Sequence, residues 1–120
     1  IMVGIVTGRP SNALLHRCQN LGIDLVFDGV KDKAKALDTI VLKTGIPPDH
    51  IAFMGDDLID LPAMLKVGVD ITVPNAPAEV RDRAHIITRS QGGKGAVREI
   101  CETILKAQGL WEKALAPFLS

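Results

Sequence analysis

Three aspartates stand close together directly after a short apolar run in the middle of the chain. Asp56, Asp57 and Asp60 follow the run IAFM at 51–54. Like charges a few Å apart disfavour ionisation unless a cation or strong hydrogen-bond donors compensate them. Mg²⁺ is a natural compensator, because it prefers oxygen ligands and needs few carboxylates besides water and a substrate phosphate. The alternative is that Asp56 or Asp57 caps a helix, and the motif alone does not decide between the two.

Two further positions favour phosphate chemistry. Thr7 and Gly8 follow the first apolar run, IMVGIV, and Lys33 lies shortly after the second, LVF. A hydroxyl and backbone amides at a strand end can bind phosphate oxygens, and a lysine ammonium adds a compact positive charge. Each residue alone is more typical of a turn or of a solvated helix. Together with the aspartates, they predict a site for a metal ion and a phosphate group.

These residues require a particular scaffold, because ligands of open α/β sheets collect at the carboxyl ends of parallel strands. Short apolar runs alternate with amphipathic stretches along the chain, which is typical of βαβ units in a Rossmann-like parallel sheet flanked by helices. The predicted strands are 2–6, 25–27, 51–54, 71–73 and 85–87. The first predicted helix is capped by Ser11 and ends at Gly22. The other predicted helices cover 32–44, 61–67, 78–83 and about 95–108. The stretch IPPDH at 46–50 is predicted to be a loop.

Helical periodicity predicts which faces are buried. The inward residues of the predicted helices are Leu14, Cys18 and Leu21 in the first, Leu37, Ile40 and Val41 in the second, and Val97, Ile100, Cys101, Ile104 and Leu105 in the last. The tail 110–119, which contains Trp111 and Phe118, is apolar. We expect it to dock on this domain or on a neighbouring subunit.

Composition excludes several classes of protein. The 120 residues fit one domain, with 14 basic and 14 acidic side chains and 47% hydrophobic residues, which is too apolar for intrinsic disorder. Three Phe, one Trp and no Tyr give too few rings for a surface that stacks nucleic-acid bases. No apolar run is long enough for a membrane span, and the expected compartment is the cytoplasm. Cys18 and Cys101 are predicted to be reduced, packed thiols.

Four stretches in a fixed order carry a family resemblance. TGR at 7–9, GVKDK at 29–33, GDDLIDLPAM at 55–64 and GGKGAVRE at 92–99 together resemble the haloacid dehalogenase superfamily, and within it a small group of phosphatases without a cap domain. The resemblance covers almost the whole chain. Thr7 takes the place of the family's second motif, Lys33 of the third, and Asp56 with Asp60 of the GDxxxD fourth motif.

The resemblance implies a reaction and roles for residues. The reaction is hydrolysis of a phosphate monoester of an acidic eight-carbon or nine-carbon keto-sugar, with Mg²⁺ and an aspartyl-phosphate intermediate, in lipopolysaccharide biosynthesis. Asp56 binds the metal, with Asp57 as a second ligand, while Asp57 and Asp60 orient the metal's surroundings. Thr7 and Lys33 hold the transferred phosphoryl group. The candidates for binding the sugar acid are Thr7, Gly8, Arg9, Lys94 and Arg98; for Lys94 and Arg98, a loop and an ordinary helix start explain the sequence equally well.

One family motif is absent from the printed sequence. The DxD motif, whose first Asp is the nucleophile and whose second is the acid/base, occurs nowhere in the 120 residues. In the family, this motif lies on a central strand between the first and third strands predicted here. We therefore expect a single domain that lacks its N-terminal central strand, with a gap in the sheet, and a preceding DxD segment in the natural protein. Without that strand, the sheet needs rearrangement or pairing with another copy.

Two functions from different classes remain open at this stage. The first is the phosphatase, with a small sugar phosphate as its partner, no nucleic acid or membrane, and a homotetramer by family resemblance. The second is a non-catalytic oligomerisation domain of a sugar-activating enzyme of the acylneuraminate cytidylyltransferase type. Thr7, Lys33 and Asp56 favour the enzyme, because a scaffold needs no cation site facing a phosphate site. A phosphorelay receiver domain is disfavoured, because its acidic residues come first in the chain.

Overall fold

The computed structural model describes residues 2–10 and 12–119. Along the chain, the strands are β1 (Gly4–Val6), β2 (Leu25–Phe27), β3 (Ala52–Met54), β4 (Val69–Thr72) and β5 (Ile86–Ile87). The helices are α1 (Asn12–Leu21), α2 (Lys33–Thr44), α3 (Leu61–Met64), α4 (Ala78–Arg81), α5 (Ala96–Ala107) and α6 (Trp111–Leu119). Single 3-10 turns, η1 (Pro48–His50) and η2 (Leu58–Asp60), flank β3. The predicted alternation of strands and helices is confirmed.

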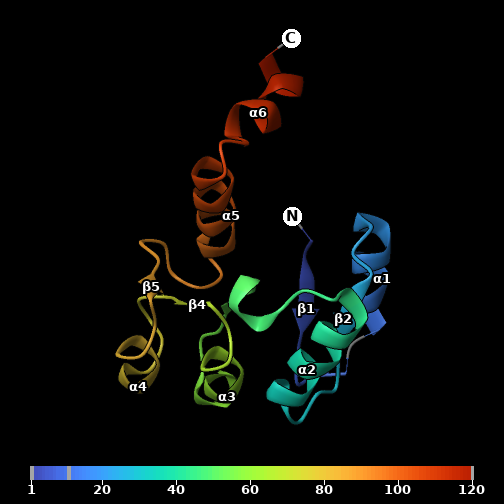
Figure 1. Ribbon diagram of the computed structural model, residues 1–120, viewed down its shortest axis with the longest axis vertical. Helices are drawn as coiled ribbons and strands as arrows, with labels where there is room; N and C mark the ends of the chain where they lie inside the picture. The colour runs from blue at the N-terminus through green and yellow to red at the C-terminus, as the bar shows by residue number, and fades with distance from the viewer. Residues whose placement is uncertain (1, 11, 120) are drawn as a thin grey trace.

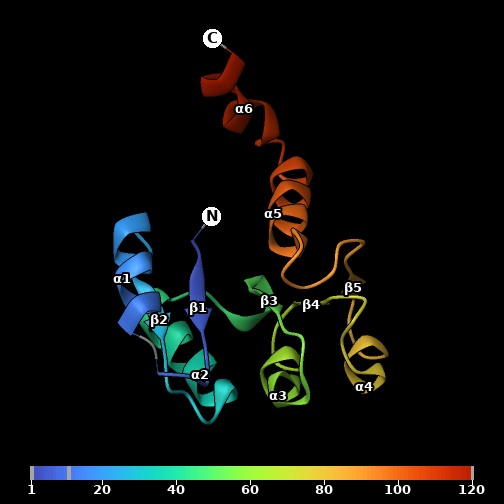
Figure 2. The same cartoon turned by 180° about the vertical axis from the view of Figure 1, so that it is seen from behind.

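The strands form two separate parallel sheets. β1 pairs with β2, with Ile5 opposite Val26, while β3, β4 and β5 form a second sheet in that order. Both ribbon views place β1 on the side of its sheet that faces β3 (Figures 1 and 2). Among the described strands, none pairs with the second edge of β1 or of β3. The break lies between the first and third strands, where the sequence predicts a missing one.

Most helices and strands are shorter than the sequence predicts. Strand pairing begins at Gly4 in β1 and at Ile86 in β5, and α3 and α4 are single turns that end before 67 and 83. The predicted loop 46–50 contains η1, because Pro48 fixes the first turn in a helical conformation. The predicted cap Ser11 lies outside the described residues, and Cys18 of the first helix is buried.

Helix α2 follows its sequence signals closely. The Asp32 side chain accepts a hydrogen bond from the Lys35 amide at 3.2 Å, which caps the first turn. Gly45 ends the helix with φ of 71° and donates its amide to the Val41 carbonyl, a left-handed conformation that favours glycine. Its buried residues are Ala34, Ala36 and Leu37, while Ile40 and Val41 are only half-buried. The predicted inward face is therefore correct at Leu37, but the observed buried face includes Ala34 and Ala36 in place of Ile40 and Val41.

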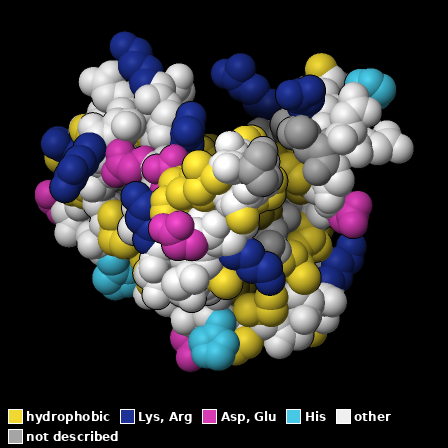
Figure 3. Space-filling view, turned by 90° about the horizontal axis from the view of Figure 1, so that it is seen from above, with side chains coloured by type: hydrophobic (Ala, Val, Ile, Leu, Met, Phe, Trp, Pro, Cys, Tyr) yellow, Lys and Arg dark blue, Asp and Glu magenta, His cyan; other side chains and the backbone are white. Residues whose placement is uncertain are grey.

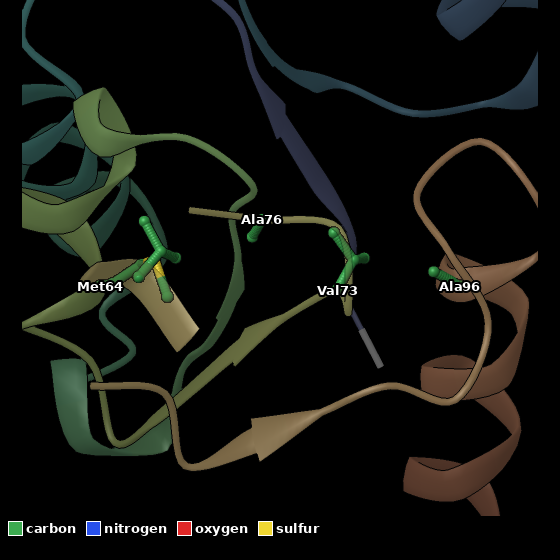
Figure 4. Close-up of a cluster of buried hydrophobic side chains, with 5 residues drawn as sticks. Met64, Val73, Ala76 and Ala96 are labelled. Atoms are coloured by element: carbon green, nitrogen blue, oxygen red, sulfur yellow. The ribbon is translucent and has the colours of Figure 1, made fainter. Parts of the chain in front are cut away.

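The core lies around the three-stranded sheet. Met64 of α3, Val73 and Ala76 after β4, Val80 of α4 and Ala96 of α5 form a buried cluster. In Figure 4, Met64 and Ala96 lie on opposite sides of Val73 and Ala76. Through Ala96, the first turn of α5 packs against this core. Burying small and aliphatic side chains of this kind stabilises the sheet and fixes the loops at its carboxyl edge.

Helices α5 and α6 project away from the sheets, and the C-terminus lies at the far end of the long axis (Figures 1 and 2). The molecule is elongated, with extents of 45 × 32 × 28 Å. The predicted inward stripe of α5 is therefore only partly correct: Ile100 is buried, but Val97 is 65% exposed and Cys101 is exposed. No described helix is both long and apolar enough to cross a membrane.

Candidate functional site

Asp60 is the centre of the candidate site. Its side chain is almost fully buried, and its Oδ1 accepts a hydrogen bond from Lys33 Nζ at 2.5 Å. Its Oδ2 accepts hydrogen bonds from the backbone amides of Asp56 at 2.9 Å and Asp57 at 3.1 Å. One carboxylate thus connects the start of α2 with the loop after β3. The structure thereby brings Lys33 and the aspartate cluster together, although 27 residues separate Lys33 from Asp60.

The loop after β3 is shaped by a close backbone approach. A Cβ atom at Gly55 would lie 2.5 Å from Asp60 Cβ, so this position accepts only glycine without a shift of the backbone. The Gly55 carbonyl accepts a hydrogen bond from the buried Thr72 hydroxyl at 2.7 Å, and its amide donates to the Ile71 carbonyl at 3.0 Å. The neighbouring strand β4 therefore fixes the point at which the GDD segment leaves the sheet.

The three aspartates have different environments, and the capping role predicted for Asp56 or Asp57 is seen at Asp57. Asp57 caps η2: its Oδ1 accepts from the Leu58 amide at 2.7 Å, in a reciprocal capping box with Asp60. Asp56 is exposed, and nothing in the described part of the chain pairs with its carboxylate. Asp56 is therefore the aspartate available to an incoming cation, while Asp57 and Asp60 shape its loop.

Thr7 lies at the carboxyl end of β1. Its amide donates to the Phe27 carbonyl and its carbonyl accepts from the Val30 amide, each at 2.9 Å. These bonds tie the end of β1 to the segment that leads into Lys33. The Thr7 hydroxyl accepts from the Arg9 amide at 3.3 Å, which forms a tight turn around Gly8. The side chain of Arg9 is exposed.

The loop at 88–95, between β5 and α5, carries the predicted residue Lys94. The Glu99 carboxylate accepts hydrogen bonds from the amides of Arg89, at 2.9 Å to Oε2, and Ser90, at 2.8 Å to Oε1. These backbone donors lower the pKa of Glu99 below its ordinary value of 4.5, because they stabilise the charged form. Lys94 itself is exposed.

Arg98 lies apart from the other predicted site residues. Its Nε donates to Glu102 Oε1 at 3.1 Å within α5, and the side chain lines a groove between α5 and α6 together with Leu105 and Trp111. In this chain the structure therefore groups Lys33, Asp56, Asp57 and Asp60, ties Thr7 to the approach to Lys33, and leaves Arg98 paired within α5.

The donor set suits magnesium only in part. Within the described residues, no group of three or more His, Cys, Asp or Glu side chains is arranged around a common metal position. Mg²⁺ usually takes one or two protein carboxylates and completes its octahedron with water and substrate phosphate. An exposed Asp56 fits that role as one ligand of an incomplete set.

Sequence patterns do not single out Thr72, Asn75 or Glu99. Thr72 is a buried polar residue of β4, as is Asp70 in the same strand, and a buried polar side chain has to find a partner. Asn75 Oδ1 accepts from the Gly92 amide at 3.2 Å and so ties the loop after β4 to the loop at 88–95. For Glu99 the only signal was an acidic residue in the first turn of a helix, which is common on ordinary surface helices.

A family model matches most of the chain. The model of the haloacid dehalogenase-like hydrolases matches residues 23–100. This range includes Lys33 and the three aspartates at 56, 57 and 60.

Named relatives agree with that match. The chain is 42% identical over 114 residues to the 3-deoxy-D-manno-octulosonate 8-phosphate phosphatase of Escherichia coli K12, which covers 95% of this chain and 61% of the relative. A solved phosphatase of the same name from Yersinia pestis aligns with a TM-score of 0.91 at 41% identity, covering 93% of this chain and 60% of that one. The Moraxella catarrhalis phosphatase, solved with magnesium, phosphate and KDO, aligns with a TM-score of 0.93 at 43% identity, covering 98% and 68%. The chain thus spans about three fifths of the length of the curated relatives it matches.

Proposed function

Because this chain belongs to the haloacid dehalogenase-like hydrolases, we propose that it is part of a phosphatase that hydrolyses 3-deoxy-D-manno-octulosonate (KDO) 8-phosphate to KDO and phosphate. The observation that carries the proposal is the joining of Lys33 to the aspartate loop through buried Asp60. An ammonium held at this edge of the sheet, beside an exposed carboxylate, is suited to a phosphate group with its metal ion. The phosphatase relatives give further support, since their names state this substrate.

Each residue of the site has a proposed task. Lys33 and Thr7 hold the phosphoryl group and stabilise its charge during transfer. Asp60 is a positioning residue that fixes Lys33 and the amides of Asp56 and Asp57. Gly8, Arg9 and Lys94 contact the acidic sugar, while Arg98 reaches it only after leaving Glu102 or from a neighbouring copy.

Asp56, with Asp57 as a second candidate, is the proposed magnesium ligand. When bound, Mg²⁺ supplies positive charge that offsets the negative charge of the phosphate oxygens. Asp57 can join through a carboxylate lone pair that the Leu58 amide does not use. The Moraxella catarrhalis phosphatase binds magnesium, which supports assigning the same cofactor to this chain.

The nucleophile is proposed to come from a DxD segment that precedes residue 1 in the natural protein. Such a strand would pair with the open edges of β1 and β3, which face each other across the break. Its carboxylate would attack phosphorus, releasing the sugar hydroxyl and forming an aspartyl phosphate, which water then hydrolyses. The short coverage of the relatives is consistent with this additional segment.

The alternative function, an oligomerisation domain of a sugar-activating enzyme, gains no support from the named relatives, which are phosphatases. We propose a homotetramer for the enzyme itself, working in the cytoplasm on an intermediate of lipopolysaccharide biosynthesis. The exposed apolar side chains of α6 support contacts between copies: Phe118 is 84% and Leu119 is 74% exposed. Seen from above, hydrophobic side chains gather near the centre of the molecule (Figure 3).

The proposal is tested with the chain extended by its natural upstream segment. KDO 8-phosphate should be hydrolysed in the presence of Mg²⁺, and EDTA should stop the reaction. Asp56→Ala should lower kcat by at least about 100-fold, because the metal loses its main proposed protein ligand. The matched control Asp49→Ala changes an exposed aspartate in η1 and should leave hydrolysis intact. Activity that survives both EDTA and Asp56→Ala would refute the metal assignment.

A further inference from the structure

The loop at 88–95 is held in one shape by contacts from three parts of the chain. Glu99 Oε1 accepts from the Ser90 amide, and both carboxylate oxygens accept from the Arg89 amide. The buried Thr88 side chain donates to the Ser90 carbonyl at 2.7 Å. Asn75, after β4, accepts from the Gly92 amide. Hydrogen bonds therefore hold the backbone of this loop as far as Gly92, two residues before Lys94.

The same contacts place the loop at the edge of the sheet where the aspartates lie. A Cβ atom at Gly92 would lie 3.5 Å from Val73 Cγ2, so the loop folds back over the end of β4. β4 is the direct neighbour of β3, with Ile71 opposite Met54. Lys94 thus follows a backbone that is fixed against the strand next to the one that carries Asp56.

Glu99 is built into this arrangement more firmly than a helix-surface glutamate requires. Its backbone amide donates to the Gly95 carbonyl at 3.0 Å, in the first turn of α5. The core residue Ala96 fixes that turn against the sheet. The carboxylate therefore extends from an anchored helix start to two consecutive amides ten and nine residues earlier in the chain. Charge-assisted hydrogen bonds of this kind are stronger than neutral ones.

We propose that Glu99 is a positioning residue for substrate binding: its carboxylate holds the loop at 88–95 so that Lys94 and the loop amides meet the acidic end of the sugar phosphate. The inference rests on the proposed function. It adds a residue that does not itself contact substrate, and it assigns the acidic end of the substrate to this loop. The phosphate end belongs to Lys33 and Thr7, so a loss of Glu99 should weaken binding and leave the chemical step nearly intact.

Steady-state kinetics with KDO 8-phosphate test this inference in the chain extended by its upstream segment. Glu99→Ala should raise KM about tenfold and change kcat by less than about twofold. Glu99→Gln keeps one oxygen acceptor for the Arg89 and Ser90 amides and should raise KM by about threefold or less. The control Glu79→Ala removes an exposed glutamate of α4 and should change neither constant.

A double-mutant cycle with Lys94 separates positioning from a general loss of stability. If Glu99 acts through the loop, Glu99→Ala should raise KM by less than about twofold in a Lys94→Ala background, because the contact it supports is already gone. Hydrogen exchange supplies the structural readout: the Arg89 and Ser90 amides should exchange faster in Glu99→Ala and stay protected in Glu79→Ala.

The outcomes show separately whether the role of Glu99 or the proposed phosphatase function fails. A wild-type protein that does not hydrolyse KDO 8-phosphate would overturn both. An active wild type with unchanged KM in Glu99→Ala, or with equal effects in the presence and absence of Lys94, would overturn the inference alone. If Glu99→Ala does not fold, Glu99→Gln decides: a raised KM with kcat preserved supports the role, and wild-type KM rejects it.

Discussion

At the scale of single residues, the ion pair between Lys33 and Asp60 determines how the site is assembled. Asp60 is almost fully buried and Lys33 is largely buried, so neither charge is well solvated by water. A carboxylate in this position needs its donors, and it has three of them: the lysine ammonium and two backbone amides. Stability and the proposed function therefore depend on the same atoms.

Lys33→Met should destabilise the chain strongly, because it leaves the Asp60 charge buried without its ammonium partner. We expect a loss of about 3–5 kcal/mol in the free energy of unfolding, measured by urea denaturation. The exposed pair of Lys66 and Asp38, 3.5 Å apart, supplies the control. Lys66→Met should cost less than about 1 kcal/mol. Equal losses in both variants would show that burial of the first pair has no energetic consequence.

Protonation of the Glu99 carboxylate should be visible in the amide proton resonances of Arg89 and Ser90, which donate to it. Its pKa is lowered by the backbone hydrogen bonds from Arg89 and Ser90, so the bonds persist above pH 4.5 and are lost as the pH falls through the lower folded value. The amide proton resonances of Arg89 and Ser90 should move together with a midpoint below pH 4.5. A midpoint at or above the ordinary glutamate value would contradict these hydrogen bonds in solution.

At the scale of elements, the turn from β3 into η2 is the part of the fold that most constrains its sequence. Gly55→Ala places a Cβ atom 2.5 Å from Asp60 Cβ, so the aspartate or the backbone has to shift. We expect a loss of about 1–3 kcal/mol in the free energy of unfolding. Gly92→Ala, whose new atom would meet its nearest neighbour at 3.5 Å, is the control. A fully stable Gly55→Ala would mean that the turn is less tightly packed than its geometry indicates.

Sequence patterns predicted these elements better than they predicted their contacts. The alternation of apolar runs predicted all five strands, and Gly45 marked the end of α2 correctly, because a helix-ending glycine acts locally. The start was predicted one residue early, at Asp32, which is the cap before Lys33. The inward face predicted for α5 was wrong at Val97, because periodicity does not show how far along a helix the rest of the fold covers it. Thr7, Lys33 and Asp56 could be selected by residue type and position. The bonds from Thr72, Asn75 and Glu99 could not, because they join residues that only the tertiary structure brings together.

At the scale of the whole molecule, the projecting helices α5 and α6 dominate the shape (Figure 1). Trp111 begins α6 and its ring faces the Lys106 ammonium at 5.0 Å, which ties the two helices together. Phe118 at the other end is largely exposed. An apolar helix held out from the body in this way is a suitable contact between copies.

Phe118→Asp should shift the proposed tetramer toward smaller species, because it places a charge in the contact. Light scattering of the chain with its upstream segment measures the change in mass. Leu42→Asp alters a similarly exposed side chain on α2, 85% accessible, and should leave the mass unchanged. A tetramer that survives Phe118→Asp would place the contact elsewhere, and a monomeric wild type would reject the tetramer.

The break between the two sheets has a consequence for cooperativity. A continuous sheet melts as one unit, since every strand loses its neighbours together. Here, the half containing β1 and β2 is joined to the other half by the packing of α2 against α3 and by the Lys33–Asp60 and Lys66–Asp38 pairs, and not by a strand ladder. Calorimetry of the 120-residue chain should therefore resolve two transitions, and Lys33→Met should separate them further. Supplying a strand that fills the break should merge them into one, so the sharpness of melting becomes a direct measure of whether the sheet is whole.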